Sequence, residues 1–155
     1  MPAWADFERE APELAVAARS FLDAHVHKTL ATIRADGSPR ISGTELNFQG
    51  DDVWIGSMLD AYKARDLQRD PRYAVHSGSD SPPDWKGDAK FSGVAHELTD
   101  EETIRDVNGP EHVGKSHLFR LDIELVSVVH MNDAGDRIIV ETWKPGAGVS
   151  RIERD

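Results

Sequence analysis

The sequence predicts a mainly β protein, an antiparallel β-barrel or sheet with peripheral helices. Segments of strand-like composition follow one another through short turns, as they do in hairpins. Helical segments are too few to alternate with the strands, which argues against a parallel sheet. The length of 155 residues suits one domain with one core. We therefore expect a single domain over residues 1–155, with about seven strands and three helices.

Composition and charge narrow the possible partners. The chain has 18 Lys and Arg against 28 Asp and Glu, a net charge of −10, so nucleic acid and anionic lipid would be repelled. The absence of cysteine excludes disulfides and cysteine-ligated metals. No apolar run approaches the roughly 18–20 residues of a spanning helix, and the first ten residues do not resemble a secretory signal. We expect a cytoplasmic protein that contacts neither membrane nor nucleic acid.

The N-terminal segment, residues 1–25, is predicted to be helical. Trp4 and Phe7 form a short apolar face, and Pro12 restarts the helix at a position that tolerates proline. Apolar residues then recur at the spacing of an amphipathic helix, which predicts packing on the core and no chemistry. These residues are Leu14, Ala17, Ala18, Phe21 and Leu22.

Three strands with short turns are expected next. Residues 28–34 are rich in β-branched residues and end at Ala35-Asp36-Gly37-Ser38, which is a hairpin signal. Residues 40–49 form the second strand, and Gly50-Asp51-Asp52 leads into the third over residues 53–57. Glycines lie within the second and third strands at Gly43 and Gly56. Such glycines indicate either a bend or a place where another molecule approaches the backbone, and both interpretations stay open.

The stretch from Trp54 to His76 predicts an anion site. Ser57 ends the third strand, and residues 60–70 form a short helix with Lys63 and Arg65 in its first turns. A hydroxyl, two cations and the free N–H groups of a helix start therefore converge on one volume, where phosphate is the natural guest. The alternative is a solvated helix face in which the cations are paired with neighbouring carboxylates. Those carboxylates are Asp60, Asp66 and Asp70.

The second half of the chain continues the pattern of strands. Thr99 and Glu102 fit a capping box that begins a short helix, which ends near Asn108. The tail, residues 144–155, contains proline and glycine and is polar, and it is not counted among the expected strands. The expected strands are residues 73–77, 88–98, 116–131 and 137–143, with a loop over residues 78–87.

No catalytic motif is visible. The seven histidines follow no metal-ligand spacing and are interpreted as scattered surface or half-buried residues. There is no nucleophile elbow, dinucleotide fingerprint or P-loop. A phosphate pocket without an acid, base or nucleophile indicates a cofactor that carries its own chemistry.

The order and spacing of four motifs resemble the pyridoxamine 5′-phosphate oxidase-like, FMN-binding split-barrel superfamily over about residues 21–146. The motifs are KTLATIRADGSPRISGTELNF at 28–48, VWIGSMLDAYKARDLQRDPRYAVH at 53–76, DAKFSGVAHEL at 88–98 and Trp143-Lys144-Pro145-Gly146. The resemblance implies an antiparallel split barrel that works as a homodimer, with flavin at the subunit interface.

Carried over by position, the resemblance also implies the cofactor contacts. Lys63 matches the family's phosphate-binding lysine, the Ser57 hydroxyl follows Gly56 onto the phosphate, and Arg65 and Arg40 are further phosphate candidates. The second strand would lie along the flavin ring and ribityl chain through Arg40, Ile41, Ser42, Gly43, Thr44 and Glu45.

Two further positions follow from the same resemblance. Lys90 matches a strand position that faces the cofactor, and Trp143 falls where some members place an aromatic residue of the partner subunit near the flavin. No side chain is expected to be a covalent catalyst. The basic C-terminal region that holds the substrate phosphate in the oxidases proper has no equivalent after Trp143, so vitamin B6 oxidase activity is not expected.

The expected function is therefore an FMN-dependent oxidoreductase acting on a small organic substrate. Two alternatives remain: a reductase of the same fold that uses the deazaflavin F420, and a non-enzymatic flavin-binding or storage protein. A cofactor-free structural dimer is a third.

Overall fold

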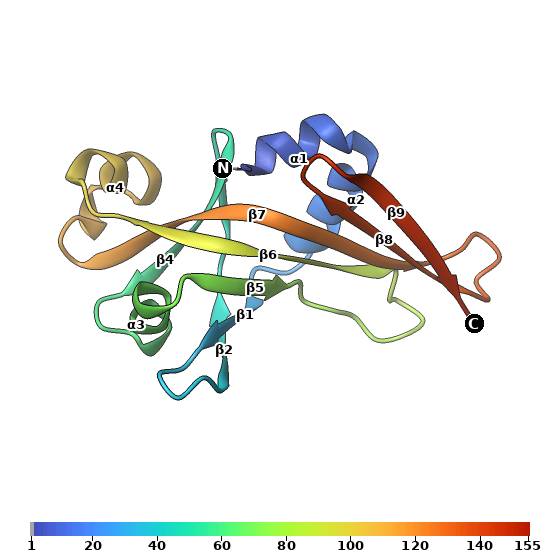
Figure 1. Cartoon of the computed structure of the whole chain (residues 1–155), viewed down its shortest axis with the longest axis horizontal. Helices are drawn as coiled ribbons and strands as arrows, with labels where there is room; N and C mark the ends of the chain where they lie inside the picture. Colours follow the sequence, from blue (N-terminus) through green and yellow to red (C-terminus); the bar gives the residue numbers. More distant parts are fainter. Residues whose placement is uncertain (1) are drawn as a thin grey trace.

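The computed structural model describes residues 2–155 and shows nine strands joined in one open antiparallel sheet, flanked by helices (Figure 1). The expected class, antiparallel β with peripheral helices, is confirmed, with more strands than the sequence predicted. The strands are β1 (Lys28–Ile33), β2 (Pro39–Thr44), β3 (Asn47–Gln49), β4 (Asp52–Met58), β5 (Arg72–His76), β6 (Gly87–Leu98), β7 (Ser116–Met131), β8 (Ile138–Lys144) and β9 (Gly148–Arg154).

The strand order explains why the sheet is a split barrel rather than a closed one. Neighbours run β2-β1-β5-β6-β7-β4-β3, and β8 and β9 continue from the far half of β7. The two end strands, β2 and β3, are not paired with each other within residues 2–155. The long strand β7 therefore serves both parts, pairing with β4 through its first half and with β8 through its second half.

Four α-helices and one 3₁₀ helix accompany the sheet, and three helix starts differ from the predicted ones. The helix that carries Lys63 begins at Tyr62 rather than at residue 60, because Asp60 has a φ angle of +59°, outside the helical region. The predicted N-terminal helix is two helices, because Ala11 before Pro12 adopts a non-helical backbone. The fourth helix is capped by Asp100 rather than Thr99, since the Asp100 carboxylate accepts from the Thr103 N–H at 3.0 Å. The helices are α1 (Trp4–Glu10), α2 (Pro12–Asp23), α3 (Tyr62–Arg69), α4 (Glu101–Asn108) and η1 (Pro110–His112).

Two predicted strand boundaries are also corrected. Residues 40–49 form two strands, because the chain leaves β1 after Thr44 and joins β4 from Asn47 onward. The tail over 144–155 contains a strand that was not expected, since residues 148–154 form β9 on β8. Gly146 and Gly148 have φ angles of +72° and +71°, which glycine adopts without strain and which turn the chain into this hairpin.

The core lies between the sheet and the N-terminal helices α1 and α2. Leu14, Ala18 and Leu22 of α2 are buried, so the predicted apolar stripe does face the sheet. Trp4 packs edge-on against Phe91 of β6, with ring centroids 5.8 Å apart. Within residues 2–155, no helix has both the length and the apolar character needed to cross a bilayer.

Candidate functional site

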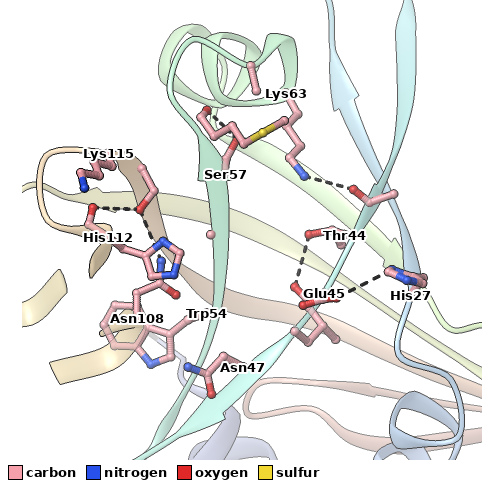
Figure 2. A pocket seen from close by; sticks show the side chains of 16 residues that line it. His27, Thr44, Glu45, Asn47, Trp54, Ser57, Lys63, Asn108, His112 and Lys115 are labelled. Carbon is pink, nitrogen blue, oxygen red and sulfur yellow. Dashed lines mark hydrogen bonds and ion pairs between the residues drawn. The ribbon is translucent and has the colours of Figure 1, made fainter. Parts of the chain in front are cut away.

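A cavity of about 720 Å³ lies beside β4, a volume within the usual range for cofactor and substrate sites, roughly 300–1,000 Å³. Ser57 of β4 lies between its two sides (Figure 2), and Gly56 also lines it. Strand β2 and helix α3 contribute Gly43, Thr44 and Lys63 on one side. The segment that follows α4 contributes the other side.

Lys63 supplies a cation without a carboxylate partner. Its Nζ donates a hydrogen bond to the carbonyl oxygen of Gly43 at 3.0 Å. Partial burial lowers the pKa of this ammonium group, because water solvates the charge less well there. No ion pair joins Lys63 to a carboxylate in the part of the chain that the structure describes. Two of its three N–H donors are therefore available to an anion.

Ser57 lies at the same cavity. Its side chain is buried at the end of β4, and its hydroxyl donates to the Met58 carbonyl at 3.3 Å. Ser57 and Lys63 line one cavity, so the structure brings together the hydroxyl and the ammonium that the sequence predicted to converge. The convergence follows from the short connection between β4 and α3.

The two strand glycines differ in what surrounds them. A Cβ atom on Gly43 would meet nothing within 4 Å, so no packing within this chain requires glycine there. A Cβ on Gly56 would come within 3.1 Å of the Asn108 Nδ2. Gly43 therefore leaves an open stretch of backbone at the cavity, while Gly56 also makes room for the neighbouring asparagine.

Arg40 does not line the cavity. Its Nε donates to the Asp66 Oδ2 at 2.7 Å, and the Asp66 carboxylate also accepts from Thr32 at 2.8 Å and Arg69 at 2.9 Å. Burial alone would raise the pKa of Asp66, but the hydrogen bonds from Arg40, Thr32 and Arg69 outweigh it and hold that pKa below its usual value. The guanidinium of Arg40 thus anchors α3 to the β1–β2 hairpin.

Several other predicted residues also lie outside the cavity. Arg65 is exposed, with a loose ion pair of 3.9 Å to Asp60, as the solvated-helix alternative expects. Ile41 and Ser42 lie on β2 but do not line the cavity. Lys90 is exposed on β6, opposite His76 of β5.

The position of Trp143 differs from the expected one. Its ring is fully buried in the core of this chain, 4.9 Å from the ring of Phe7. An aromatic side chain in this place holds α1 against β8 and is not presented to a partner subunit. The sequence pattern located the residue on the correct strand but not the direction of its side chain.

The cavity includes residues that sequence reasoning missed. Asn108, His112 and Lys115 lie on the side of β4 opposite Lys63 (Figure 2). The Ser116 hydroxyl ties this segment together by donating to the His112 carbonyl at 3.3 Å. No local sequence pattern predicts these residues. They follow β4 by about fifty positions in the chain, and only the fold brings them against it.

The chemistry of the cavity is that of anion binding. Lys63 stands on one side of β4 and Lys115 on the other, with hydroxyl and backbone groups between them. The Glu45 carboxylate also lines the cavity, 4.0 Å from the His27 ring. No group of three or more metal-ligating side chains occurs among residues 2–155. The arrangement can hold an anionic molecule along β4, but its own side chains form no nucleophile–base pair.

Comparison with known proteins identifies the family to which the chain is similar. The model of the family described as pyridoxamine 5′-phosphate oxidase matches residues 14–130. No curated protein matches the chain.

Solved structures show the same fold at low sequence identity. A conserved hypothetical protein of Mycobacterium tuberculosis, Rv2991, is 21% identical, with a TM-score of 0.60 over 72% of this chain and 81% of its own. A pyridoxamine 5′-phosphate oxidase-related, FMN-binding protein of Nostoc punctiforme is 13% identical, with a TM-score of 0.62 over 96% of each chain. The haem storage protein HutZ of Vibrio cholerae is 19% identical, with a TM-score of 0.56 over 74% of this chain and 90% of its own.

Proposed function

The chain belongs to the pyridoxamine 5′-phosphate oxidase family, and we propose that it binds FMN in the cavity beside β4 and acts as a flavin-dependent oxidoreductase on a small organic substrate. One observation carries the proposal. Lys63 is a half-buried cation without a carboxylate partner, beside a serine hydroxyl, in a molecule of net charge −10. Such a cation is best explained by an anionic guest.

The residues present fit a flavin phosphate. Lys63 and Ser57 would hold the phosphate through charge-assisted hydrogen bonds, which are stronger than neutral ones. Gly43 leaves the β2 backbone open, so a flat ring system could lie against it. An FMN-binding protein of the same fold, from Nostoc punctiforme, adds support.

A bound flavin would supply hydride exchange, which the side chains of this cavity do not. The residues of the chain would bind and orient. Lys63 would neutralise phosphate charge, and the β2 backbone near Gly43 and Thr44 would fix the ring and influence its electronics. Substrate would enter from the open side of the cavity.

We also propose that the working unit is a homodimer. Four large apolar side chains next to the cavity are between 52% and 79% exposed, which is unusual for an isolated surface. They lie on β2, at the end of β4, in the connection after it and at the start of α3, so a second copy seated there would cover them and close the cavity. They are Ile41, Met58, Leu59 and Tyr62.

The decisive experiment is a titration of purified protein with FMN, riboflavin, F420 and haem, alongside the spectrum and mass of any molecule that co-purifies. FMN should bind more tightly than riboflavin, which lacks the phosphate. Binding of F420 or haem in preference to FMN would overturn the cofactor assignment. Bound FMN that no electron donor or substrate turns over would identify a flavin-binding or storage protein instead.

A further inference from the structure

The connection between Ser57 and Lys63 contains a backbone conformation that needs support. Asp60 has a φ angle of +59°, and it is the one non-glycine residue among residues 2–155 with positive φ. Aspartate tolerates this left-handed region better than most residues, although it still costs free energy. Because Asp60 lies between the two anion-binding residues, its conformation sets how the start of α3 is placed relative to the end of β4.

His117 provides that support from β7. Its Nε2 accepts a hydrogen bond from the backbone N–H of Asp60 at 3.3 Å. A backbone N–H can only donate, so Nε2 carries no proton and the imidazole is neutral. The proton is then on Nδ1, which donates to the Glu97 carboxylate at 2.6 Å. His117 also lies directly opposite Ser57 in the pairing of β4 with β7.

Glu97 extends the support to helix α3. Its second carboxylate oxygen accepts from the Gln68 Nε2 at 2.9 Å. The His117–Glu97 pair therefore holds the connection at Asp60 and the helix at Gln68, so both ends of the segment that carries Lys63 are fixed to the same two strands.

We propose that His117 is a positioning residue of the anion site, active only as the neutral imidazole that accepts from Asp60. The proposal rests on the proposed function, in that the anion is taken to be the flavin phosphate. The charged group in contact with the ring is Glu97 from β6. Asp60 contacts the ring through its backbone N–H, and its carboxylate is loosely paired with Arg65. The neighbouring aromatic ring is that of Phe119.

Protonation of His117 removes the acceptor. An Nε2–H would then face the Asp60 N–H, and two donors cannot form a hydrogen bond. The imidazolium keeps its contact with Glu97 but releases the connection, so Ser57 and Lys63 lose their fixed spacing. FMN affinity should therefore fall when acid protonates His117.

Three variants separate this role from general effects. His117→Phe removes the acceptor, and His117→Gln places a non-titrating amide oxygen near the position of Nε2. His130→Phe is the matched control. His130 is also on β7, and its Nε2 lies 2.8 Å from the Glu141 carboxylate, but it does not line the cavity. FMN affinity is measured for each from about pH 8 to pH 5.

At high pH, His117→Phe should bind FMN about two- to tenfold more weakly than the wild type, which is the usual worth of one hydrogen bond. His117→Gln should keep most of the affinity and lose the wild-type decline in acid beyond that caused by the phosphate itself. His130→Phe should follow the wild type. Identical profiles for the wild type and His117→Phe, with both proteins folded, would overturn the proposal.

A readout that needs no flavin separates this inference from the proposed function. Amide hydrogen exchange at Asp60 should be faster in His117→Phe than in the wild type, and imidazole NMR should show the wild-type proton on Nδ1. If neither the wild type nor any variant binds FMN, but the Asp60 amide exchanges faster in His117→Phe, the cofactor assignment fails and the positioning role stands. If the exchange of the Asp60 amide is unchanged in His117→Phe, the positioning role fails whatever FMN does.

Discussion

The ammonium of Lys63 and the carbonyl oxygen of Gly43 are joined by a hydrogen bond of 3.0 Å across the rim of the cavity. This contact holds helix α3 against strand β2 and keeps a cation without a carboxylate partner at the cavity. It also leaves the side chain aimed along an open stretch of backbone, since a Cβ on Gly43 would touch nothing. The proposed function thus places anion binding and ring binding on two residues that touch each other.

Replacing Lys63 by alanine should weaken FMN binding by about 1.5–3 kcal/mol, the usual worth of a hydrogen bond to a charged group. Riboflavin affinity should change much less, because it has no phosphate for Lys63 to hold. Titration calorimetry or flavin fluorescence measures both. Lys90→Ala removes an exposed lysine outside the cavity and serves as the control. An unchanged dissociation constant for FMN in Lys63→Ala would show that Lys63 does not bind the phosphate.

Gly43→Val should separate cofactor binding from folding. Valine suits a strand, and the position has open space, so the melting temperature should stay the same or rise slightly. FMN affinity should nevertheless drop at least tenfold if the ring lies against this backbone, because the new side chain would occupy its place. A variant that binds FMN normally would show that the ring lies elsewhere.

Trp143 should matter for stability and not for the cofactor. Trp143→Ala leaves a cavity beside Phe7 and should lower the free energy of unfolding by about 3–5 kcal/mol. Trp143→Phe keeps most of the packing and should retain wild-type FMN affinity. Denaturant unfolding and FMN titration of the two variants check this. A large loss of FMN affinity in a stably folded Trp143→Phe variant would show that Trp143 takes part in cofactor binding.

Asp66 should make part of the stability sensitive to acid. Its pKa is held below the usual 3.8 of a carboxyl group, so its contribution is complete above that pH and is lost as the pH falls through its lower, folded value. Asp66→Asn should cost about 3 kcal/mol near neutral pH, the lower end for a broken buried pair. The gap from the wild type should narrow below pH 3.8. Urea unfolding at several pH values tests this, and a gap that does not depend on pH would contradict it.

Local signals predicted most of the fold. The Asp36-Gly37 turn, the stripe on α2 and the short helix around Lys63 each depend on neighbouring residues, and the structure contains all three. Strand β9 was missed because Pro145, Gly146 and Gly148 indicate irregular structure, whereas two of them form a hairpin turn. Turn residues mark where a chain bends but not whether it continues as a strand.

The site was predictable only where it is local. Ser57 and Lys63 come together through a connection of a few residues, so their proximity follows from the sequence. The ion pair of Arg40 with Asp66 could not be predicted in this way. Asp66 lies 26 positions away and reaches Arg40 only when α3 packs on the β1–β2 hairpin. His117 carried no motif at all, and its role depends on the pairing of β7 with β4.

The excess of 28 acidic over 18 basic side chains has a consequence for kinetics. A dianionic molecule diffusing toward this protein meets long-range repulsion before it reaches the ammonium of Lys63 beside Gly43. Added salt shortens the range of that repulsion to about 10 Å at 0.1 M. Association should therefore become faster as ionic strength rises, opposite to the behaviour of electrostatically steered ligands, while the bound contact itself weakens.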